Sequence, residues 1–296
     1  MSGTQCIIII LFVRVIQQYT SKRSSMLIPS SLYGNVKYFM LSKLFAAVFA
    51  MILLTVGNEW TRIDLSTVLI STASGIMLVL GSVCGLYAIR SGTMALSSLF
   101  ATAGLLVPCI AGIFLYGETM SLWQWLGVLL FFLSSYLLIG AGKRANGSFN
   151  IKTVLLLIGS LLSNGIVMLL QTVFSREVEN GSVTAFSFLS FILPALILLV
   201  AMGGMKLKNP TACTERISKK LLLIMLLSSL ALFIVNQLST TATALVEPAI
   251  LFTLINGGNT VIAAVMAAVL FKEKFTVRSA IGILLGVVAL VIVKAL

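Results

Sequence analysis

Asparagine and glutamine side chains lie inside the most apolar segments of this 296-residue sequence, where they can form hydrogen bonds with a polar substrate. An amide in hydrocarbon must find a partner or face a wet cavity. We therefore predict a substrate-binding cavity, with candidate residues Gln17, Tyr87, Thr102, Asn164, Gln171, Asn236, Gln237, Thr240, Asn256 and Asn259. The alternative for each residue is an interhelical hydrogen bond or simple packing. Gly257-Gly258, between two of these amides, could let a helix unwind toward the substrate, or could permit close packing.

Charged groups are scarce in the same segments. No aspartate or glutamate falls at the centre of a predicted membrane span. A proton-driven exporter of cations needs a buried carboxylate that proton and substrate share. The sequence therefore disfavours that mechanism and favours a facilitator or exchanger of neutral, zwitterionic or anionic solutes. Arg14, well inside a span, could bind a carboxylate or phosphate, but so near the chain start we expect it to extend to the headgroups.

Residues for catalysis or metal binding are missing from the sequence. Histidine is absent, and the four cysteines are scattered without metal-ligand spacing. There is no His-Glu-x-x-His motif and no aspartate pair within a span. We therefore expect neither an enzyme nor a bound cofactor or metal.

The elements that must position these side chains are membrane-spanning helices. Hydrophobic residues make up 59 % of the chain and charged residues 9 %, and apolar runs near twenty residues recur along it, which favours helices in lipid. We predict an all-α integral membrane protein with ten spans, at 6–19, 38–56, 66–89, 94–116, 122–140, 153–174, 184–202, 220–242, 249–271 and 278–295. The first is weak, and we expect it to be a short helix.

An internal repeat organises these spans. A shift of 155 residues places Glu118 on Glu273 and Gly127 on Gly282, and a shift of 154 places Gln17 on Gln171. The predicted organisation is a five-helix repeat over 1–141, a linker at 142–152 and a second repeat over 153–296. Because each repeat has an odd number of helices, the two run in opposite directions through the membrane, and the substrate site is expected between them.

Basic residues concentrate on one side of this topology. Sixteen of the 20 lysines and arginines, Lys43 among them, are assigned to loops after odd-numbered spans. The positive-inside rule puts that face in the cytoplasm and both termini outside. We expect a multi-pass protein of the cell (plasma) membrane, whose partners are the lipid bilayer and a small-molecule substrate. Nucleic-acid binding is disfavoured, because the charges serve topology, and a homodimer remains open.

A few residues have structural interpretations. Glu118 and Glu273 could couple transport to an ion, but we favour a role in orienting the tight turn between two spans. Pro108 and Pro194 lie within spans, and each should free a carbonyl four residues earlier, at Gly104 and Ser190. Gly81-xxx-Gly85 and Gly282-xxx-Gly286 are typical of close helix packing.

The paired helix-Glu-helix stretches resemble the drug/metabolite transporter superfamily, in particular its ten-helix EamA-like branch. The resemblance rests on residues 107–118 with Ser121 and Gly127, and on 263–273 with Thr276 and Gly282. It implies a carrier of small, amino-acid-like metabolites that works by alternating access. Two departures are the positions of the prolines and the acidic second loop, Asn58 to Asp64, where the family would have basic residues. The alternative is a non-transporting membrane scaffold or a subunit of a larger complex.

Overall fold

The structure is a computed structural model. It describes residues 2–29, 31–91, 94–108, 151–208, 217–243, 245–246, 248–272 and 277–295, and, between them, 110–111, 121–123, 125–127, 129–130, 133–134 and 137. The regular structure of the described residues is helical throughout, without a strand. Six helices are long and apolar enough to cross a membrane: α1, α2, α3, α7, α8 and α9. The prediction of an all-α membrane fold is confirmed at this level.

The first helix is longer than expected. α1 runs from Gly3 to Leu27 instead of covering only 6–19, and it begins with a capping box in which Ser2 and Gln5 hydrogen-bond reciprocally. The expectation of a short helix was wrong because Arg14 and the glutamines after it do not end the span; they face the protein interior. α2 spans Leu32–Val56, with Ser31 capping it by accepting a hydrogen bond from the Gly34 backbone N–H at 3.0 Å.

The next elements form the rest of the described first half. A short 3₁₀ turn, η1 (Trp60–Arg62), precedes α3 (Leu65–Ser91), at whose start Asp64 accepts a hydrogen bond from the Thr67 backbone N–H at 2.8 Å. α4 spans Met94–Thr102 and passes into a 3₁₀ turn, η2 (Ala103–Leu105). The backbone therefore leaves α-helical geometry at Gly104, where Pro108 was expected to free a carbonyl.

Five helices make up the described second half. They are α7 (Ile151–Glu177), α8 (Val183–Lys208), α9 (Lys219–Ala242), α10 (Pro248–Val269) and α11 (Val277–Ala295). α8 continues as a helix through Pro194. α10 also continues through Gly257-Gly258, so the unwinding considered there is not observed, and a β-carbon at Gly258 would lie 2.5 Å from Leu11 of α1.

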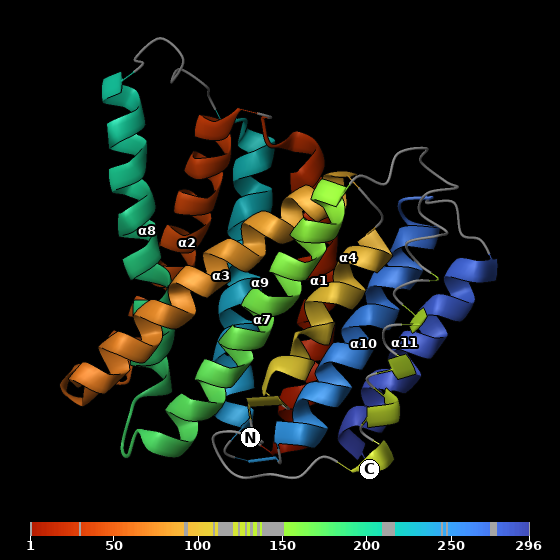
Figure 1. Cartoon of the computed structure of the whole chain (residues 1–296). Helices are drawn as coiled ribbons and strands as arrows, with labels where there is room; N and C mark the ends of the chain where they lie inside the picture. Colours follow the sequence, from red (N-terminus) through yellow and green to blue (C-terminus); the bar gives the residue numbers. More distant parts are fainter. Residues whose placement is uncertain are drawn as a thin grey trace.

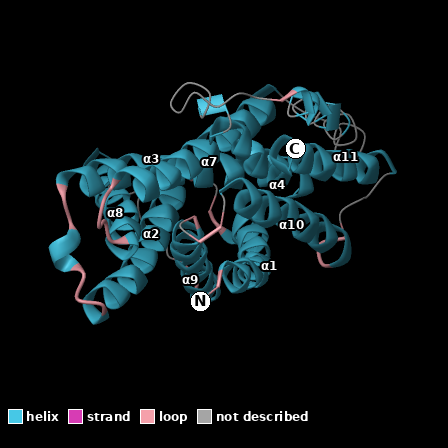
Figure 2. Cartoon of the chain, turned by 90° about the horizontal axis from the view of Figure 1, so that it is seen from below, coloured by secondary structure: helices cyan, strands magenta, loops and turns pink. Residues whose placement is uncertain are grey.

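The helices form one bundle with the beginning of α1 and the end of α11 at the same end, the lower end in Figure 1. α1, α3, α8 and α10 run upward, and α2, α4, α7, α9 and α11 run downward. The main contacts join α2 to α8, α3 to α7 and α8, α9 to α1 and α2, and α10 to α1, α4 and α11. α8 and α11 lie on opposite sides of the bundle in both views (Figures 1 and 2).

Small residues allow these helices to approach closely. A β-carbon at Gly81 would lie 3.2 Å from Ser163 of α7, and one at Gly286 would lie 2.6 Å from Leu99 of α4. Gly85 has more room, because the nearest atom, the Ser160 Oγ, would be 3.8 Å away. Gly81 and Gly286 thus have the packing role that the sequence predicts.

Candidate functional site

A cavity of about 250 Å³ lies inside the bundle. Its walls come from seven helices, α1, α2, α3, α4, α7, α9 and α10, so that residues from both predicted halves face one another across it. Amides and hydroxyls dominate its polar surface, and the amide residues are Gln17, Gln18, Asn164, Gln171, Asn236, Asn256 and Asn259. This lining can offer donors and acceptors to a polar solute while the outer faces of the helices stay apolar.

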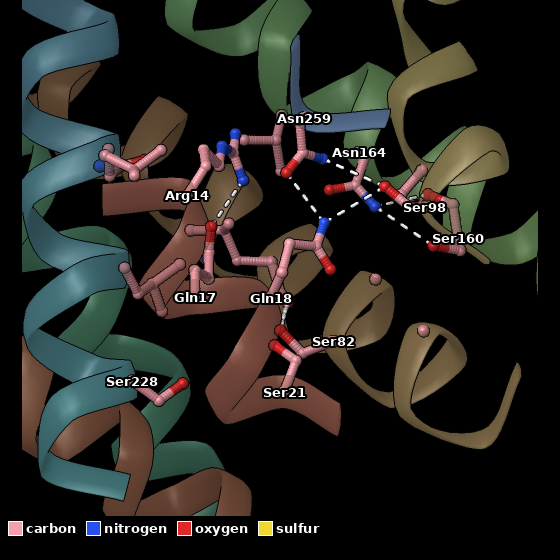
Figure 3. A pocket seen from close by; sticks show the side chains of 18 of the residues that line it. Arg14, Gln17, Gln18, Ser21, Ser82, Ser98, Ser160, Asn164, Ser228 and Asn259 are labelled. Carbon is pink, nitrogen blue, oxygen red and sulfur yellow. Dashed lines mark hydrogen bonds between the residues drawn. The ribbon is translucent and has the colours of Figure 1, made fainter. Parts of the chain in front are cut away.

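One hydrogen-bonded cluster lies in the cavity wall between α1, α4 and α10. The Gln18 side-chain N–H donates to Asn259 Oδ1 at 2.8 Å and to Ser98 Oγ at 3.2 Å. The Asn259 amide donates to the same Ser98 oxygen at 3.4 Å. Figure 3 shows these three side chains converging from different helices. The cluster links α1 and α4 to α10 through polar side chains.

A second cluster ties α7 to α9 and α8. Gln171 Nε2 donates to Asn236 Oδ1 at 2.9 Å, and Asn236 Nδ2 donates to Ser187 Oγ at 3.1 Å. Gln171 and Asn236 are both buried and line the cavity. Each still has hydrogen-bonding capacity beyond these contacts, because an amide carries two N–H donors and a carbonyl with two lone pairs.

Arg14 lines the cavity instead of reaching the headgroups, so the expectation for this residue was wrong. Its Nη1 donates to Gln17 Oε1 at 2.7 Å (Figure 3), and its buried Nε has no partner among the described residues. The reason is its position: α1 extends from Gly3 to Leu27, which places Arg14 near the middle of the helix, too far from either end to extend out of the bundle.

Lys43 is a second cation in the cavity wall, and its assignment to a cytoplasmic loop was also wrong. It lies near the middle of α2 and is 1 % exposed. Its Nζ donates to Ser82 Oγ at 3.4 Å and lies 5.9 Å from the centre of the Phe191 ring. Both contacts are weak for a charged ammonium group.

No carboxylate stands against these two cations within the described part of the chain. The residues that line the cavity include no aspartate or glutamate. The described acidic residues, Glu59, Asp64, Glu177 and Glu179, lie at or beyond helix ends. The same part of the chain holds no cluster of three or more His, Cys, Asp or Glu side chains that could bind a metal ion.

Six of the ten predicted site residues line the cavity: Gln17, Asn164, Gln171, Asn236, Asn256 and Asn259. Asn164 also donates to its own helix, at the Ser160 carbonyl oxygen at 2.7 Å, and Asn256 contacts the Met168 sulfur at 3.8 Å.

The other four lie outside the cavity lining and have structural partners. Gln237 donates to Thr184 at 3.0 Å, and Thr240 donates to the Asn236 backbone at 2.9 Å. Thr102 and Thr260 hydrogen-bond across α4 and α10 at 2.8 Å. Tyr87 accepts from Asn35 at 2.6 Å.

The structural-motif residues are partly placed. Gly127 and Gly282 are buried, and the Gly282 carbonyl accepts a hydrogen bond from Ser134 Oγ at 2.6 Å. Pro194 packs against Gly75 of α3, and Pro108 lies in the helical residues that follow η2. The residues outside the described part of the chain are Glu118, Glu273, positions 142–150 of the predicted linker and nine of the 19 positions of the span at 122–140.

Sequence reasoning missed Gln18, Ser82 and Lys43 as cavity residues. For Gln18 a signal was present: Arg14, Gln18 and Ser21 follow one another at helical spacing and form a polar stripe along one face of α1. For Lys43 the signal was its position within the apolar segment from 38 to 56.

Comparisons with known proteins bear on the fold alone. No family model matches the chain, and no curated protein matches it. A solved structure described only as "Crystal structure of protein" is similar over 97 % of this chain and 96 % of its own, with a TM-score of 0.66 and 12 % sequence identity. The arrangement of the helices is therefore one that occurs in an experimentally determined protein.

Proposed function

We propose that this chain is a secondary carrier that moves a small metabolite across the cell membrane by alternating access, in the manner of the EamA-like transporters that its sequence resembles. The observation that carries the proposal is the cavity with a partly polar lining, to which α1–α4 of the first predicted half and α7, α9 and α10 of the second contribute residues. A site between two halves can be exposed to either face of the membrane when the halves rock.

Reciprocal packing supports ten spans in two inverted repeats. If α1, α2, α3 and α4 correspond to α7, α8, α9 and α10, the main contacts between the halves come in matching pairs: α1 with α9 matches α7 with α3, and α1 with α10 matches α7 with α4. Corresponding helices run in opposite directions (Figure 1). Gln17 and Gln171, which the 154-residue shift aligns, both line the cavity.

The distribution of charge supports the proposed orientation. Described lysines and arginines gather at the upper end of Figure 1, at the ends of α1, α3 and α8 and the start of α9. The described acidic residues belong to the lower end, around η1 and the turn between α7 and α8. The upper end then faces the cytoplasm.

A carrier explains the cavity better than the alternatives do. A scaffold or a subunit of a complex has no need for a chamber lined with amides, whose polar groups cost free energy when they are buried. For an enzyme, the sequence offers no histidine as acid or base.

The test is uptake and efflux of labelled amino acids, nucleosides, sugars and organic acids in cells with and without the protein. Gln171→Leu removes an amide that lines the cavity, whereas Gln237→Leu removes one that is hydrogen-bonded to a neighbouring helix outside it. We expect selective flux of one class of solute that Gln171→Leu abolishes and Gln237→Leu preserves. Correctly inserted protein with no flux in any class would favour a scaffold.

A further inference from the structure

We propose that the transported solute is a small organic anion, whose carboxylate or phosphate oxygens are bound by Arg14 and Lys43. This inference rests on the proposed carrier function and specifies its substrate class. Both residues line the same cavity, one from α1 and the other from α2.

Arg14 has donors to spare. Its guanidinium carries five N–H groups in a fixed fork, and such a fork pairs with two oxygens of a carboxylate or phosphate at once. The described part of the chain supplies one acceptor to this side chain, Gln17 Oε1, and leaves the buried Nε without an acceptor.

Lys43 is equally undersupplied. An ammonium group has three donors, and that of Lys43 makes a long hydrogen bond to Ser82 and lies 5.9 Å from the centre of the Phe191 ring. Ser82 Oγ meanwhile donates to the backbone of its own helix, at the Leu78 carbonyl oxygen. A serine hydroxyl cannot neutralise the charge, so the ammonium group is left to interact with whatever occupies the cavity.

Buried Lys43 and Arg14, whose Nε is buried, have no acidic partner among the described residues, and this arrangement calls for an anion. The charged form of a buried side chain is costly unless it is paired and hydrogen-bonded. No carboxylate lines the cavity within the described residues, so the compensating charge has to come from the solute. A cationic solute would be repelled by both side chains, and the ammonium group of an amino acid would find no carboxylate.

The remaining lining limits size and suggests orientation. A volume of about 250 Å³ lies below the usual range for drug-sized ligands, roughly 300–1,000 Å³. The amides of Gln171, Asn236 and Asn256 line the cavity from the other half of the chain. They can hydrogen-bond hydroxyl or carbonyl groups on the uncharged part of the solute.

The experiment uses the purified full-length protein in liposomes, with labelled malate and glycerol 3-phosphate as anionic probes, and serine, glucose and putrescine as zwitterionic, neutral and cationic probes. We expect uptake of an anion. The comparison of malate with glycerol 3-phosphate distinguishes a carboxylate from a phosphate as the bound group. Arg14→Gln and Lys43→Met should each lower kcat/KM for that anion by roughly ten- to a hundredfold, the effect of losing a hydrogen bond to a charged group.

Arg23→Gln is the matched control, because it removes one positive charge from the exposed end of the same helix; it should leave anion uptake unchanged. Arg14→Lys retains the charge and should recover part of the activity, which separates loss of charge from misfolding. As a second measurement, the transported anion should raise the Tm of the detergent-purified wild type and not that of Arg14→Gln.

The proposal is overturned if the protein transports only serine, glucose or putrescine, or if both substitutions leave anion uptake intact. In the first of these outcomes the carrier function still stands. Absence of flux for every probe, with the anions also leaving Tm unchanged, would overturn the carrier function as well.

Discussion

Gly104 and Gly165 lie so close together that neither can carry a side chain. A β-carbon at Gly104 would lie 2.6 Å from the Gly165 backbone nitrogen, and one at Gly165 would overlap the Gly104 carbonyl oxygen. The contact joins η2 to α7, which belong to different predicted halves. It places the backbones of these two segments in direct contact, as small residues do between membrane helices.

We predict that Gly165→Ala destabilises the protein. The Gly104 carbonyl oxygen belongs to the backbone and cannot rotate away, and the Val107 Cβ, which is fixed to the backbone, would lie 2.5 Å from the added carbon. Overpacking of this kind costs about 1–3 kcal/mol. Gly203→Ala is the control, because a β-carbon there would meet nothing within 4 Å. The measurement is Tm in detergent together with the monodisperse fraction on gel filtration. Equal Tm values for the two variants would contradict the observed contact.

A second close approach joins Gly75 to Pro194 and Ser190. A β-carbon at Gly75 would overlap the Ser190 carbonyl oxygen and would lie 2.6 Å from Cγ of Pro194. Proline has no N–H to bond that carbonyl from one turn further along. Because a β-carbon would overlap these atoms, Gly75→Ala should lower Tm.

Pro194→Ala removes the ring and restores the donor, so it should relieve part of that clash. We expect the double variant Gly75→Ala/Pro194→Ala to be more stable than the sum of the two single effects predicts. A double-mutant cycle on Tm or on the denaturation midpoint measures this coupling. Additive effects would show that the ring does not contribute to the obstruction.

Arg90 stabilises the connection between α1 and α2 through hydrogen bonds to its backbone. Its Nε donates to the Ser25 carbonyl oxygen at 2.9 Å and its Nη2 to that of Ile28 at 2.7 Å. Lysine cannot reproduce a fork that reaches two carbonyls. Arg90→Lys should cost about 1.5–3 kcal/mol for each charged hydrogen bond that is lost.

Arg23→Lys serves as the comparison for Arg90→Lys, since Arg23 is exposed and its hydrogen bond is a 3.3 Å contact with Tyr19. Thermal unfolding of both variants in the same detergent gives the result. If Tm falls as much for Arg23→Lys as for Arg90→Lys, the two hydrogen bonds from the Arg90 guanidinium to backbone carbonyls do not contribute specifically to stability.

The carboxylate of Asp64 gives a pH-dependent contribution to stability. Its pKa is lowered, first by the nearby Thr67 hydroxyl and then by the Thr67 backbone N–H, which donates to Asp64 Oδ1 at 2.8 Å. A group whose pKa is lower in the folded state stabilises the protein above its unfolded pKa, and this stabilisation is lost as pH falls through the folded pKa. Asp64→Asn keeps a capping acceptor but removes the charge.

We therefore expect a small decrease in Tm for Asp64→Asn at neutral pH that disappears in acid, below the pKa of Asp64 in the folded protein. Tm measured from pH 7 down to pH 3 for both proteins tests this expectation. A difference that stays constant over that range would assign the effect to geometry instead of charge.

Much of the fold can be predicted from the sequence. Segments of predominantly apolar residues must close their backbone hydrogen bonds within helices, so the helical class and most helix positions follow from the length of those segments. The length of α1 does not follow from this rule, because Arg14, Gln17 and Gln18 interrupt the apolar run without ending the helix. Counting consecutive apolar residues does not recognise a membrane-spanning helix that carries polar residues along one face.

The sequence predicts only part of the candidate site, because it does not show which face of a helix points inward. Gln171 and Gln237 are both amides in apolar helices, yet Gln171 faces the cavity and Gln237 faces α8. In a membrane the lipid and the protein core are equally apolar, so hydrophobic patterning does not tell which face of a helix points inward. The amino-acid sequence by itself determined which polar groups had to find partners. Only the packing of α1 and α2 against the other helices decided that Arg14 and Lys43 share one chamber.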